Sequence, residues 1–239
     1  PEVLKFFMSI GVPLFEAYGM TENCAYATSN SPENIKIGTV GIPAHGVELK
    51  LADDGEILIR SGGVFKGYFK DDQATSETID KDRWLHTGDV GIYEGDFVKI
   101  IDRKRDIIIT SGGKNVSPSE IENKIKVSPF IKEAIVIGDR RKFLSVLIGI
   151  EFDTVSNWAL RKNIPHTTYR DLSEKQEVKD LVWKEISRAN ELTSSLEVRE
   201  FRMIPKELDH EEGELTATQK VKRNVLIDQF SDLIEEMYS

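Results

Sequence analysis

The chain has 239 residues, of which 39% are hydrophobic and 31% are charged. This balance is typical of a globular protein with a sizeable core, and it excludes a disordered chain, a collagen and a coiled coil. Lys and Arg number 32 against 41 Asp and Glu, and the resulting charge of −9 argues against nucleic acid or an anionic membrane as a general partner. We also expect no membrane-spanning segment and no signal peptide.

The single cysteine, Cys24, excludes an internal disulfide framework and fits a reducing compartment. No activating group lies near it in the sequence, so we expect a small thiol that is buried or half-buried. The chain begins at Pro1 and its first methionine is Met8, so we expect that this is not a native start.

Charge is divided unevenly along the chain. Residues 1–102 contain 9 Lys and Arg against 17 Asp and Glu, whereas residues 103–239 contain 23 against 24. The change falls at the basic run Arg103-Lys104-Arg105. Such a shift is typical of a domain junction, so we expect one domain over residues 1–102 and a second over residues 103–239. Chance clustering of surface charge would give the same pattern.

The predicted elements of the first portion are mostly strands. Val12–Phe15 has the composition of a short buried strand. Val47–Leu51 and Glu56–Arg60 alternate apolar and polar residues on either side of the turn Asp53-Asp54-Gly55, which predicts a hairpin. Phe97–Ile101 predicts a further strand.

The second portion combines strands with helices. Strands are predicted over Asp106–Thr110, Ile131–Ile137 and Ser145–Ile150, and Ser117 followed by Pro118 predicts the start of a helix that buries Ile121 and Ile125. Two later sets of apolar residues repeat at helical spacing: Val178, Leu181, Val182, Ile186 and Ala189, then Leu226, Phe230, Leu233 and Met237. The fold class is therefore mixed α/β, with a β-rich first portion and a small α+β unit after it.

Several common kinds of site are absent from the sequence. There is no Walker A loop and no Gly-x-Ser-x-Gly elbow. The four histidines, His45, His86, His166 and His210, form no pair at metal-ligand spacing.

Two segments of the first portion carry groups suited to a nucleotide. In the first, Tyr18 can stack on a base, Gly19 allows close approach of the backbone, Thr21 can bond a phosphate and Glu22 can hold Mg²⁺. In the second, Asp89 follows a Thr-Gly turn and can accept two ribose hydroxyls. Taken alone, each segment is better explained as a plain turn.

Two segments of the second portion can meet an anion. Gly112 and Gly113, followed by Lys114, can expose backbone N–H groups to an anion or a slender ligand chain. Lys220, on a polar loop, can move into a phosphoryl site as a compact charge. Taken alone, the first is also a tight connection and the second the basic start of a helix.

In this order, the segments resemble the adenylate-forming acyl-CoA synthetases, and the long-chain fatty acid branch fits best. The matching motifs are Tyr18-Gly-Met-Thr-Glu22, Gly55-Glu-Ile-Leu-Ile-Arg60 leading to Gly67-Tyr68, Trp84-Leu-His-Thr-Gly-Asp89, Asp102-Arg-Lys-Arg-Asp106 through Ser111-Gly-Gly-Lys-Asn115 to Glu120-Ile-Glu122, and the loop at Lys220. The resemblance implies the end of a large AMP-binding domain over residues 1–102 and a small mobile domain over residues 103–239, with a hinge at residues 103–106.

The resemblance also implies a reaction in two halves. A fatty acid and ATP, with Mg²⁺, give an acyl-adenylate, and the thiol of coenzyme A then displaces AMP. For the first half, Tyr18 and Gly19 would border the adenine, Thr21 the α-phosphate, and Asp89 with Arg103 the ribose. Glu22 would hold the metal ion, and Lys220 would reach the carboxylate and the α-phosphate, which makes Lys220, Thr21 and Glu22 the implied catalytic residues. For the second half, Gly112, Gly113 and Lys114 would border coenzyme A after a rotation about Arg105.

Three positions depart from the family pattern. Arg105 stands where many relatives carry an Asp hinge, and Gln219 and Arg83 stand where Gly is usual. ATP and coenzyme A are polyanions, so we expect the cations of the site to come largely from residues 103–239, including Arg103, Lys104 and Lys220.

In the family, the phosphate loop and most of the acyl tunnel precede the Tyr18 motif. We therefore expect a C-terminal piece of a synthetase that is inactive alone, and the acyl chain length is not encoded in these residues. An enzyme that loads an acyl carrier protein and a non-catalytic binding module of the same fold stay as alternatives. We expect a cytoplasmic protein with small-molecule substrates, and a lipid-like substrate is compatible with peripheral contact with a membrane. The sequence is silent on the oligomeric state.

Overall fold

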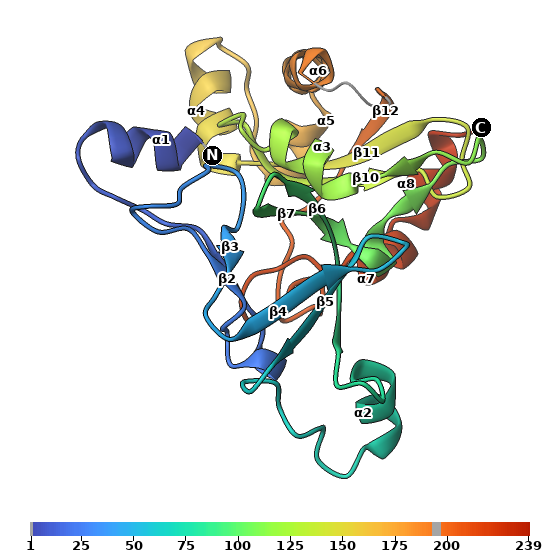
Figure 1. The fold of residues 1–239 in the computed structure, drawn as a ribbon. Coiled ribbons are helices and arrows are strands. Elements are labelled where there is room, and N and C mark those ends of the chain that lie inside the picture. The colour runs from blue at the N-terminus through green and yellow to red at the C-terminus, as the bar shows by residue number, and fades with distance from the viewer. Residues whose placement is uncertain (1, 193–196) are drawn as a thin grey trace. The chain divides into compact units, whose positions relative to one another are not determined.

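The computed structural model describes residues 2–192 and 197–239. The chain divides into two compact units, Pro1–Asp106 (unit 1) and Ile107–Ser239 (unit 2) (Figure 1). Each unit has its own buried core, and each is described by itself. In the part of the chain that the structure describes, no helix is long and apolar enough to cross a membrane.

Unit 1 is built on a four-stranded antiparallel sheet in the order β4-β5-β6-β7, with strands Val47–Leu51, Glu56–Ser61, Leu85–Glu94 and Phe97–Arg103. The predicted hairpin is confirmed, because β4 and β5 pair along their length. The predicted alternation holds in β4 but is wrong for β5, where Glu56 to Ile59 are all buried. An inner strand covered on both faces has no solvent side on which to place polar residues.

A second small sheet completes unit 1. Its strands are β1 (Ala17–Tyr18), β2 (Thr28–Ser29) and β3 (Ile42–Pro43). Val40 and Gly41, just before β3, connect it to β7. The amide of Val40 donates to the carbonyl of Val98, and the amide of Val98 donates to the carbonyl of Gly41, each at 2.8 Å. The helices are α1 (Glu2–Ser9) and α2 (Asp72–Thr78). The buried apolar core comprises Ala27, Ile57, Ile59, Val64, Ile79, Leu85 and Val98.

The prediction of a buried strand at Val12–Phe15 is wrong. The segment is irregular, and Val12, Leu14 and Phe15 are exposed. The amide of Val12 bonds to the carbonyl of Phe7 at the end of α1, and no strand among the described residues pairs with the segment. An apolar run forms a strand only where a neighbouring strand satisfies its backbone groups.

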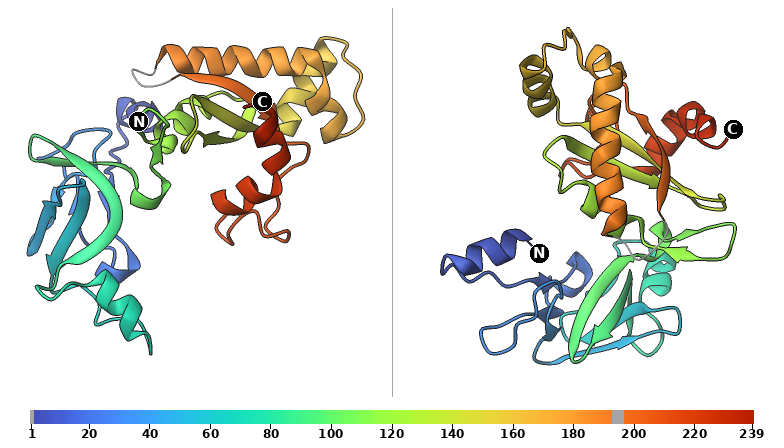
Figure 2. Two further views of the ribbon diagram at one scale, coloured as in Figure 1. Left: turned by 90° about the vertical axis from the view of Figure 1, so that its right-hand side faces the viewer. Right: turned by 90° about the horizontal axis from the view of Figure 1, so that it is seen from above.

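Unit 2 has a three-stranded sheet in the order β10-β11-β12, formed by Ile131–Ile137, Leu144–Ile150 and Val198–Met203. The first pair is antiparallel and the second is parallel. Figure 2 shows the long helix α6 (Gln176–Glu191) lying along the sheet. This arrangement confirms the predicted α+β character of the second portion.

Both faces of this sheet are buried. In β10, Ala134 and Val136 pack into a core with α3 (Pro118–Ile125), α4 (Phe152–Arg161), α5 (Tyr169–Glu174) and α6. Ile135 and Ile137 pack into a second core with α7 (Arg223–Gln229) and α8 (Ser231–Glu236). Because strand side chains alternate between faces, two covered faces require a strand that is buried along its whole length, as β11 is, with Ser145 as its one polar side chain.

The local helix signals are largely confirmed. The Ser117 hydroxyl accepts the amide of Glu120 at the start of α3, and Ile121 and Ile125 are buried. The last helix, expected as one, is divided at Phe230 into α7 and α8. The strand predicted at Asp106–Thr110 is reduced to β8 (Ile108–Ile109), which pairs with β9 (Asn115–Val116) as a short hairpin.

Two positions at which the resemblance implies Gly have left-handed backbone in this chain. Arg83 has φ +65° and Gln219 has φ +62°. A side chain in this region costs about 1 kcal/mol relative to Gly, because the Cβ crowds the backbone. Each of these side chains therefore adds local strain to its turn.

We expect the free energy of unfolding to be about 1 kcal/mol higher for the Gln219→Gly variant than for Gln219→Ala, because only Gly adopts a positive φ without a Cβ penalty. Thermal unfolding of the two variants in the same chain measures the difference, and Ala serves as the matched control for loss of the side chain. An Ala variant as stable as the Gly variant would show that the turn relaxes to a different conformation.

Candidate functional site

The first candidate site is centred on Asp89 in unit 1. Its side chain is 7% exposed, and one of its oxygens lies 2.9 Å from Nε of Arg103. The other oxygen accepts a hydrogen bond from the hydroxyl of Tyr18, 71 residues earlier in the chain. Burial, and then the bond to Asp89, raise the pKa of the Tyr18 phenol, so it stays protonated and donates at neutral pH. Three residues implied separately by the resemblance are thus in direct contact.

Strand register and a bulge present Asp89. Asp89 lies opposite Arg103 across β6 and β7, which brings the ion pair together. On the other side of β6, Glu56 pairs with Val90 and Leu58 pairs with His86, so two residues of β5 span four of β6. The extra residues form a bulge within β6, in which Gly88 has φ +69°. Bulges of this kind re-aim side chains and are common next to active sites.

Side chains satisfy the backbone of the bulge. The hydroxyl of Thr87 donates to the carbonyl of Ile57 (2.7 Å) and accepts the amide of Asp89 (3.1 Å). The amide of Gly88 donates to the carboxylate of Glu56 at 3.0 Å. The loop is therefore fixed although the strand ladder is interrupted there.

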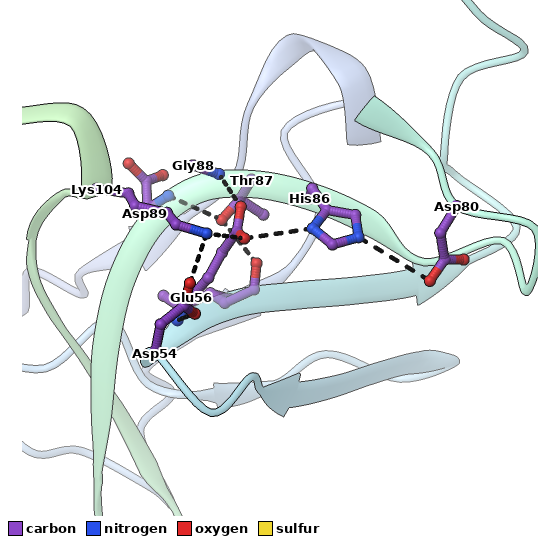
Figure 3. A network of polar contacts seen from close by, with 9 residues as sticks. Asp54, Glu56, Asp80, His86, Thr87, Gly88, Asp89 and Lys104 are labelled. Atoms are coloured by element: carbon purple, nitrogen blue, oxygen red, sulfur yellow. Dashed lines mark hydrogen bonds and ion pairs between the residues drawn. The ribbon is translucent and has the colours of Figure 1, made fainter. Parts of the chain in front are cut away.

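Glu56 is the centre of a second group of polar contacts (Figure 3). Its other oxygen lies 2.9 Å from Nζ of Lys104 and 3.3 Å from Nδ1 of His86. Lys104 also pairs with Asp54 at 2.6 Å. Burial alone would raise the pKa of Glu56, but Lys104, the Gly88 amide and His86 outweigh it and lower this pKa. Asp54 and Glu56 in turn raise the pKa of Lys104, so both partners are charged at neutral pH.

The Thr21–Glu22 segment forms a single 3-10 turn, Thr21–Asn23. The buried Asn23 side chain accepts the amide of Met20 at 2.9 Å and holds the turn. Thr21 is exposed, and the half-buried Glu22 accepts a 2.8 Å hydrogen bond from the hydroxyl of Tyr68. This bond raises the pKa of Tyr68.

The residues present would fit a magnesium ion that is held mainly by the phosphates of a nucleotide. Among residues 2–192 and 197–239, no three His, Cys, Asp or Glu side chains are grouped to hold a metal. Mg²⁺ in nucleotide sites usually keeps several waters and takes one or two carboxylates besides the phosphates. Tyr68 bonds only one oxygen, Oε1, of the Glu22 carboxylate, and a single carboxylate of this kind suits such a site.

Gly19 is required by packing inside the chain. A Cβ on Gly19 would lie 2.2 Å from the backbone of Ala25, closer than atoms can approach. Ala25 and Cys24 both have left-handed backbone and turn the chain back toward Gly19. The prediction of a buried or half-buried Cys24 is wrong: its thiol is exposed, because Cys24 caps the end of the 3-10 turn at the surface.

In unit 2, Gly112, Gly113 and Lys114 form the exposed tip of the β8–β9 hairpin. The amide of Gly113 donates to the carbonyl of Thr110 (2.9 Å), and that of Lys114 donates to its hydroxyl (3.2 Å). These two amides close the turn, so they do not act as the free anion donors that the sequence suggested. Gly113, at φ +74°, supplies the tight bend.

Lys220 lies on an ordered turn. The amide of Thr216 donates to the carbonyl of Lys220 (2.8 Å), and the Thr216 hydroxyl accepts the amide of Lys220 (3.0 Å). At the base of the turn, the buried Glu214 lies 2.7 Å from Nζ of Lys206. Burial would raise the pKa of Glu214, but Lys206 outweighs it and lowers this pKa. Lys220 itself is exposed at the end of this supported turn.

One ion pair connects the elements that follow the two loops of unit 2. Glu122 of α3 lies 2.5 Å from Arg223 at the start of α7, and both side chains are mostly buried. Both also bond the backbone of Val136 in β10 at 2.8 Å. The helix after the Gly-Gly turn and the helix after the Lys220 turn are therefore fixed to the same strand.

The expected source of the cations is corrected in part. Arg103, Lys104 and Arg105 lie in unit 1, and the first two pair with its own carboxylates. Arg105 is 84% exposed and lies 3.9 Å from Asp106. Counted by unit, the charge balance is 12 Lys and Arg against 18 Asp and Glu in residues 1–106, and 20 against 23 in residues 107–239.

No role was assigned from the sequence to Glu56, Thr87 or Tyr68, and Lys104 was named only as a cation of the expected site. All four residues lie within the family motifs, and the signal for Glu56 was a carboxylate that begins an apolar run. Its burial depends on β5 being an inner strand, which the run itself does not specify.

Comparison with known proteins identifies the class. Residues 1–69 match the family model described as AMP-binding enzyme, and residues 105–239 match that of the AMP-binding enzyme C-terminal domain. The chain is 37% identical over 237 residues to the long-chain-fatty-acid--CoA ligase FadD15 of Mycobacterium bovis, covering 98% of this chain and 39% of that protein. The chain therefore belongs to the AMP-binding enzyme family, which confirms the resemblance, and it spans about two fifths of this curated relative's length.

Solved structures agree on the fold. The adenylation domain of a carboxylate reductase from Mycobacterium chelonae superposes with a TM-score of 0.76 at 22% identity, over all of this chain and 37% of that chain. O-succinylbenzoate coenzyme A synthetase (MenE) of Bacillus subtilis, solved with ATP and a magnesium ion, gives 0.67 at 26% identity over 93% of this chain and 43% of that one. The predicted mixed α/β fold class is confirmed.

We expect Glu56→Gln to lower the unfolding free energy of β5 and β6 by about 1–2 kcal/mol at pH 7, because a buried charged hydrogen-bond partner is lost. The folded pKa of Glu56 lies below its ordinary value of 4.5, so its contribution is complete above that pH and is lost as the pH falls through the folded value. Amide hydrogen exchange of these strands at pH 7 and near pH 4 measures both effects.

Glu48→Gln is the matched control for this prediction. Glu48 lies on the same hairpin and pairs with Arg60, but both side chains are well exposed. An exposed pair contributes little, so this variant should behave like the unchanged chain at both pH values. A loss at Glu56 that stayed constant down to low pH would contradict the electrostatic explanation.

Proposed function

We propose that the chain is part of a long-chain fatty acid–CoA ligase that activates its substrate with ATP. The observation that carries the proposal is the buried Asp89 carboxylate, fixed between Tyr18 and Arg103 and suited to accept the two hydroxyls of a ribose. Family membership supports adenylate chemistry, and the name of the M. bovis relative supports a long-chain fatty acid and coenzyme A as substrates.

In the proposed first half-reaction, an oxygen of the fatty acid carboxylate attacks the α-phosphorus of ATP, and pyrophosphate leaves. Tyr18 would border the adenine beside Gly19, Asp89 and Arg103 would hold the ribose, and Thr21 would bond the α-phosphate. Glu22 would supply one ligand to Mg²⁺, whose charge offsets that of the phosphates when it is bound. The exposed ammonium of Lys220 would stabilise charge on the carboxylate and α-phosphate in the transition state.

In the proposed second half-reaction, the thiol sulfur of coenzyme A attacks the acyl carbonyl carbon, the thiol proton is lost, and AMP leaves. Gly112, Gly113 and Lys114 would border the pantetheine chain. Support comes from their exposure at a hairpin tip with no side chain near Gly113. We place the hinge at Arg105, whose exposed side chain follows two residues anchored to unit 1.

Location is part of the same proposal. We propose a cytoplasmic enzyme, which the unpaired, exposed thiol of Cys24 supports. A long-chain fatty acid partitions into lipid, so contact with a membrane surface is proposed for substrate uptake.

In the full-length enzyme, we expect Lys220→Ala to slow acyl-adenylate formation by about 100-fold or more, because a positioned cation is removed from the phosphoryl site. Thioester formation from added acyl-adenylate should change by less than about threefold, since Lys220 serves only the first half-reaction. Lys222→Ala, which removes a neighbouring exposed cation, is the control. Equal loss in both half-reactions would contradict this assignment.

The acceptor is tested by offering the full-length enzyme a long-chain fatty acid with ATP and either coenzyme A or a phosphopantetheinylated carrier protein. We expect acyl-CoA to form at least about tenfold faster than acyl-carrier, because the proposed function takes free coenzyme A as its acceptor. Preference for the carrier would support a carrier-loading ligase instead. Absence of acyl-adenylate with any acid would support a non-catalytic module.

A further inference from the structure

A closed ring of contacts surrounds the bulge that presents Asp89. Glu56 accepts the amide of Gly88 (3.0 Å), and Asp89 is the next residue. Asp89 pairs with Arg103 (2.9 Å), Lys104 is the next residue, and Lys104 returns to Glu56 (2.9 Å). Every link is a charged hydrogen bond or a peptide bond, so movement at one member is transmitted to the others.

The Glu56 side chain accepts the Gly88 amide in place of a backbone carbonyl of β5, because the bulge interrupts the pairing of the two strands there. Pairing with β5 moves from Glu56–Val90 to Leu58–His86 and leaves Thr87 to Asp89 without a partner residue in β5, although Asp89 still pairs with Arg103 in β7. Figure 3 shows the Glu56 side chain turned toward this bulge, where its carboxylate contacts the Gly88 amide and the Lys104 ammonium. A buried carboxylate in this place costs desolvation energy unless it is paired, so its retention needs both the amide and the cation.

We propose that Glu56 is a positioning residue for ribose recognition and that Lys104 completes it by holding the charge of Glu56. The inference rests on the proposed function, in which Asp89 binds the ribose. Glu56 touches no reacting group. It fixes the Gly88 amide, and thereby sets the direction in which the adjoining Asp89 carboxylate meets the ribose hydroxyls.

Lys104 gives the ring a second consequence. Arg103 and Lys104 are consecutive, and each is tied to a different buried carboxylate of unit 1, whereas the following Arg105 is 84% exposed. The same contacts that orient Asp89 therefore fix the last anchored residue before the proposed hinge.

A structural role and a positioning role differ in one measurable respect. If Glu56 only stabilises the sheet, its loss lowers activity with any nucleotide by the same factor. If it orients Asp89 toward the ribose, its loss matters mainly when the ribose hydroxyls are present. The coupling between a residue and a substrate group is measured by a cycle that removes each singly and both together.

The experiment uses the full-length enzyme with Glu56→Ala and compares ATP with 2′,3′-dideoxy-ATP in acyl-adenylate formation. We expect kcat/KM for ATP to fall by about tenfold, mostly through KM, and that for dideoxy-ATP to fall by less than about threefold. Glu48→Gln, on the same hairpin but away from the bulge, should leave the preference for ATP unchanged.

Two further variants protect the test against misfolding. Glu56→Gln keeps an oxygen for the Gly88 amide and should lower the ATP preference by about threefold, since only the charge is lost. Lys104→Met should lower it similarly by leaving Glu56 unpaired. If Glu56→Ala does not fold, these two decide.

Equal losses for both nucleotides in the folded variants would overturn the inference and leave Glu56 as a sheet-stabilising residue. The unchanged enzyme separates this failure from failure of the proposed function. If it forms no acyl-adenylate with ATP, the proposed function is wrong. If it is active but does not distinguish ATP from dideoxy-ATP, the ribose role of Asp89 is wrong, and the inference is wrong with it.

Discussion

The pairing of a buried carboxylate with a cation at the edge of an interrupted strand is the interaction on which unit 1 depends. Asp89 and Glu56 are both buried, and a buried carboxylate is costly unless it is paired, as these two are with Arg103 and Lys104. The two basic residues are consecutive at the end of β7. The end of the sheet, the bulge and the proposed ribose site therefore depend on the same few contacts. The negative net charge of this unit is thus compatible with the proposed nucleotide site, since the two buried carboxylates, Asp89 and Glu56, are each paired with a cation.

Unit 2 carries two separate loops, the hairpin tip at residues 112–114 and the Lys220 turn, on one packed body. Its sheet is covered on both faces, and its apolar strands give it a core that does not need another unit. The Glu122–Arg223 pair fixes the helices after both loops to β10. A body built this way can reorient without internal rearrangement, as exchange between two half-reactions would require.

Local signals were sufficient for the elements that local chemistry determines. The hairpin around Asp54 and Gly55 and the start of α3 at Ser117 follow from turn and capping preferences, which act within a few residues. The strand expected at Val12–Phe15 failed because pairing is decided by a distant partner. The division of the last helix at Phe230 was likewise not visible in its apolar period.

The site was predictable in its members but not in its contacts. Tyr18 and Asp89 were named from their own chemistry and Arg103 through family resemblance, yet the contact between Asp89 and Arg103 depends on the register between β6 and β7. Glu56 was overlooked because its role comes from a bulge that appears only once three strands are paired. Gly19 was assigned to ligand approach, whereas the closest backbone to it is that of Ala25. Cys24 was misjudged because cysteine is usually a buried residue type, while its left-handed backbone places it at the end of a surface turn.

The exposure of Cys24 makes the chain a natural reporter. It is the sole thiol in 239 residues, and it lies two positions after Glu22, at the end of the same turn. A fluorophore or spin label can therefore be attached at one defined point beside Glu22 without any substitution. Binding of a ligand near this turn would then be followed by the signal of the label.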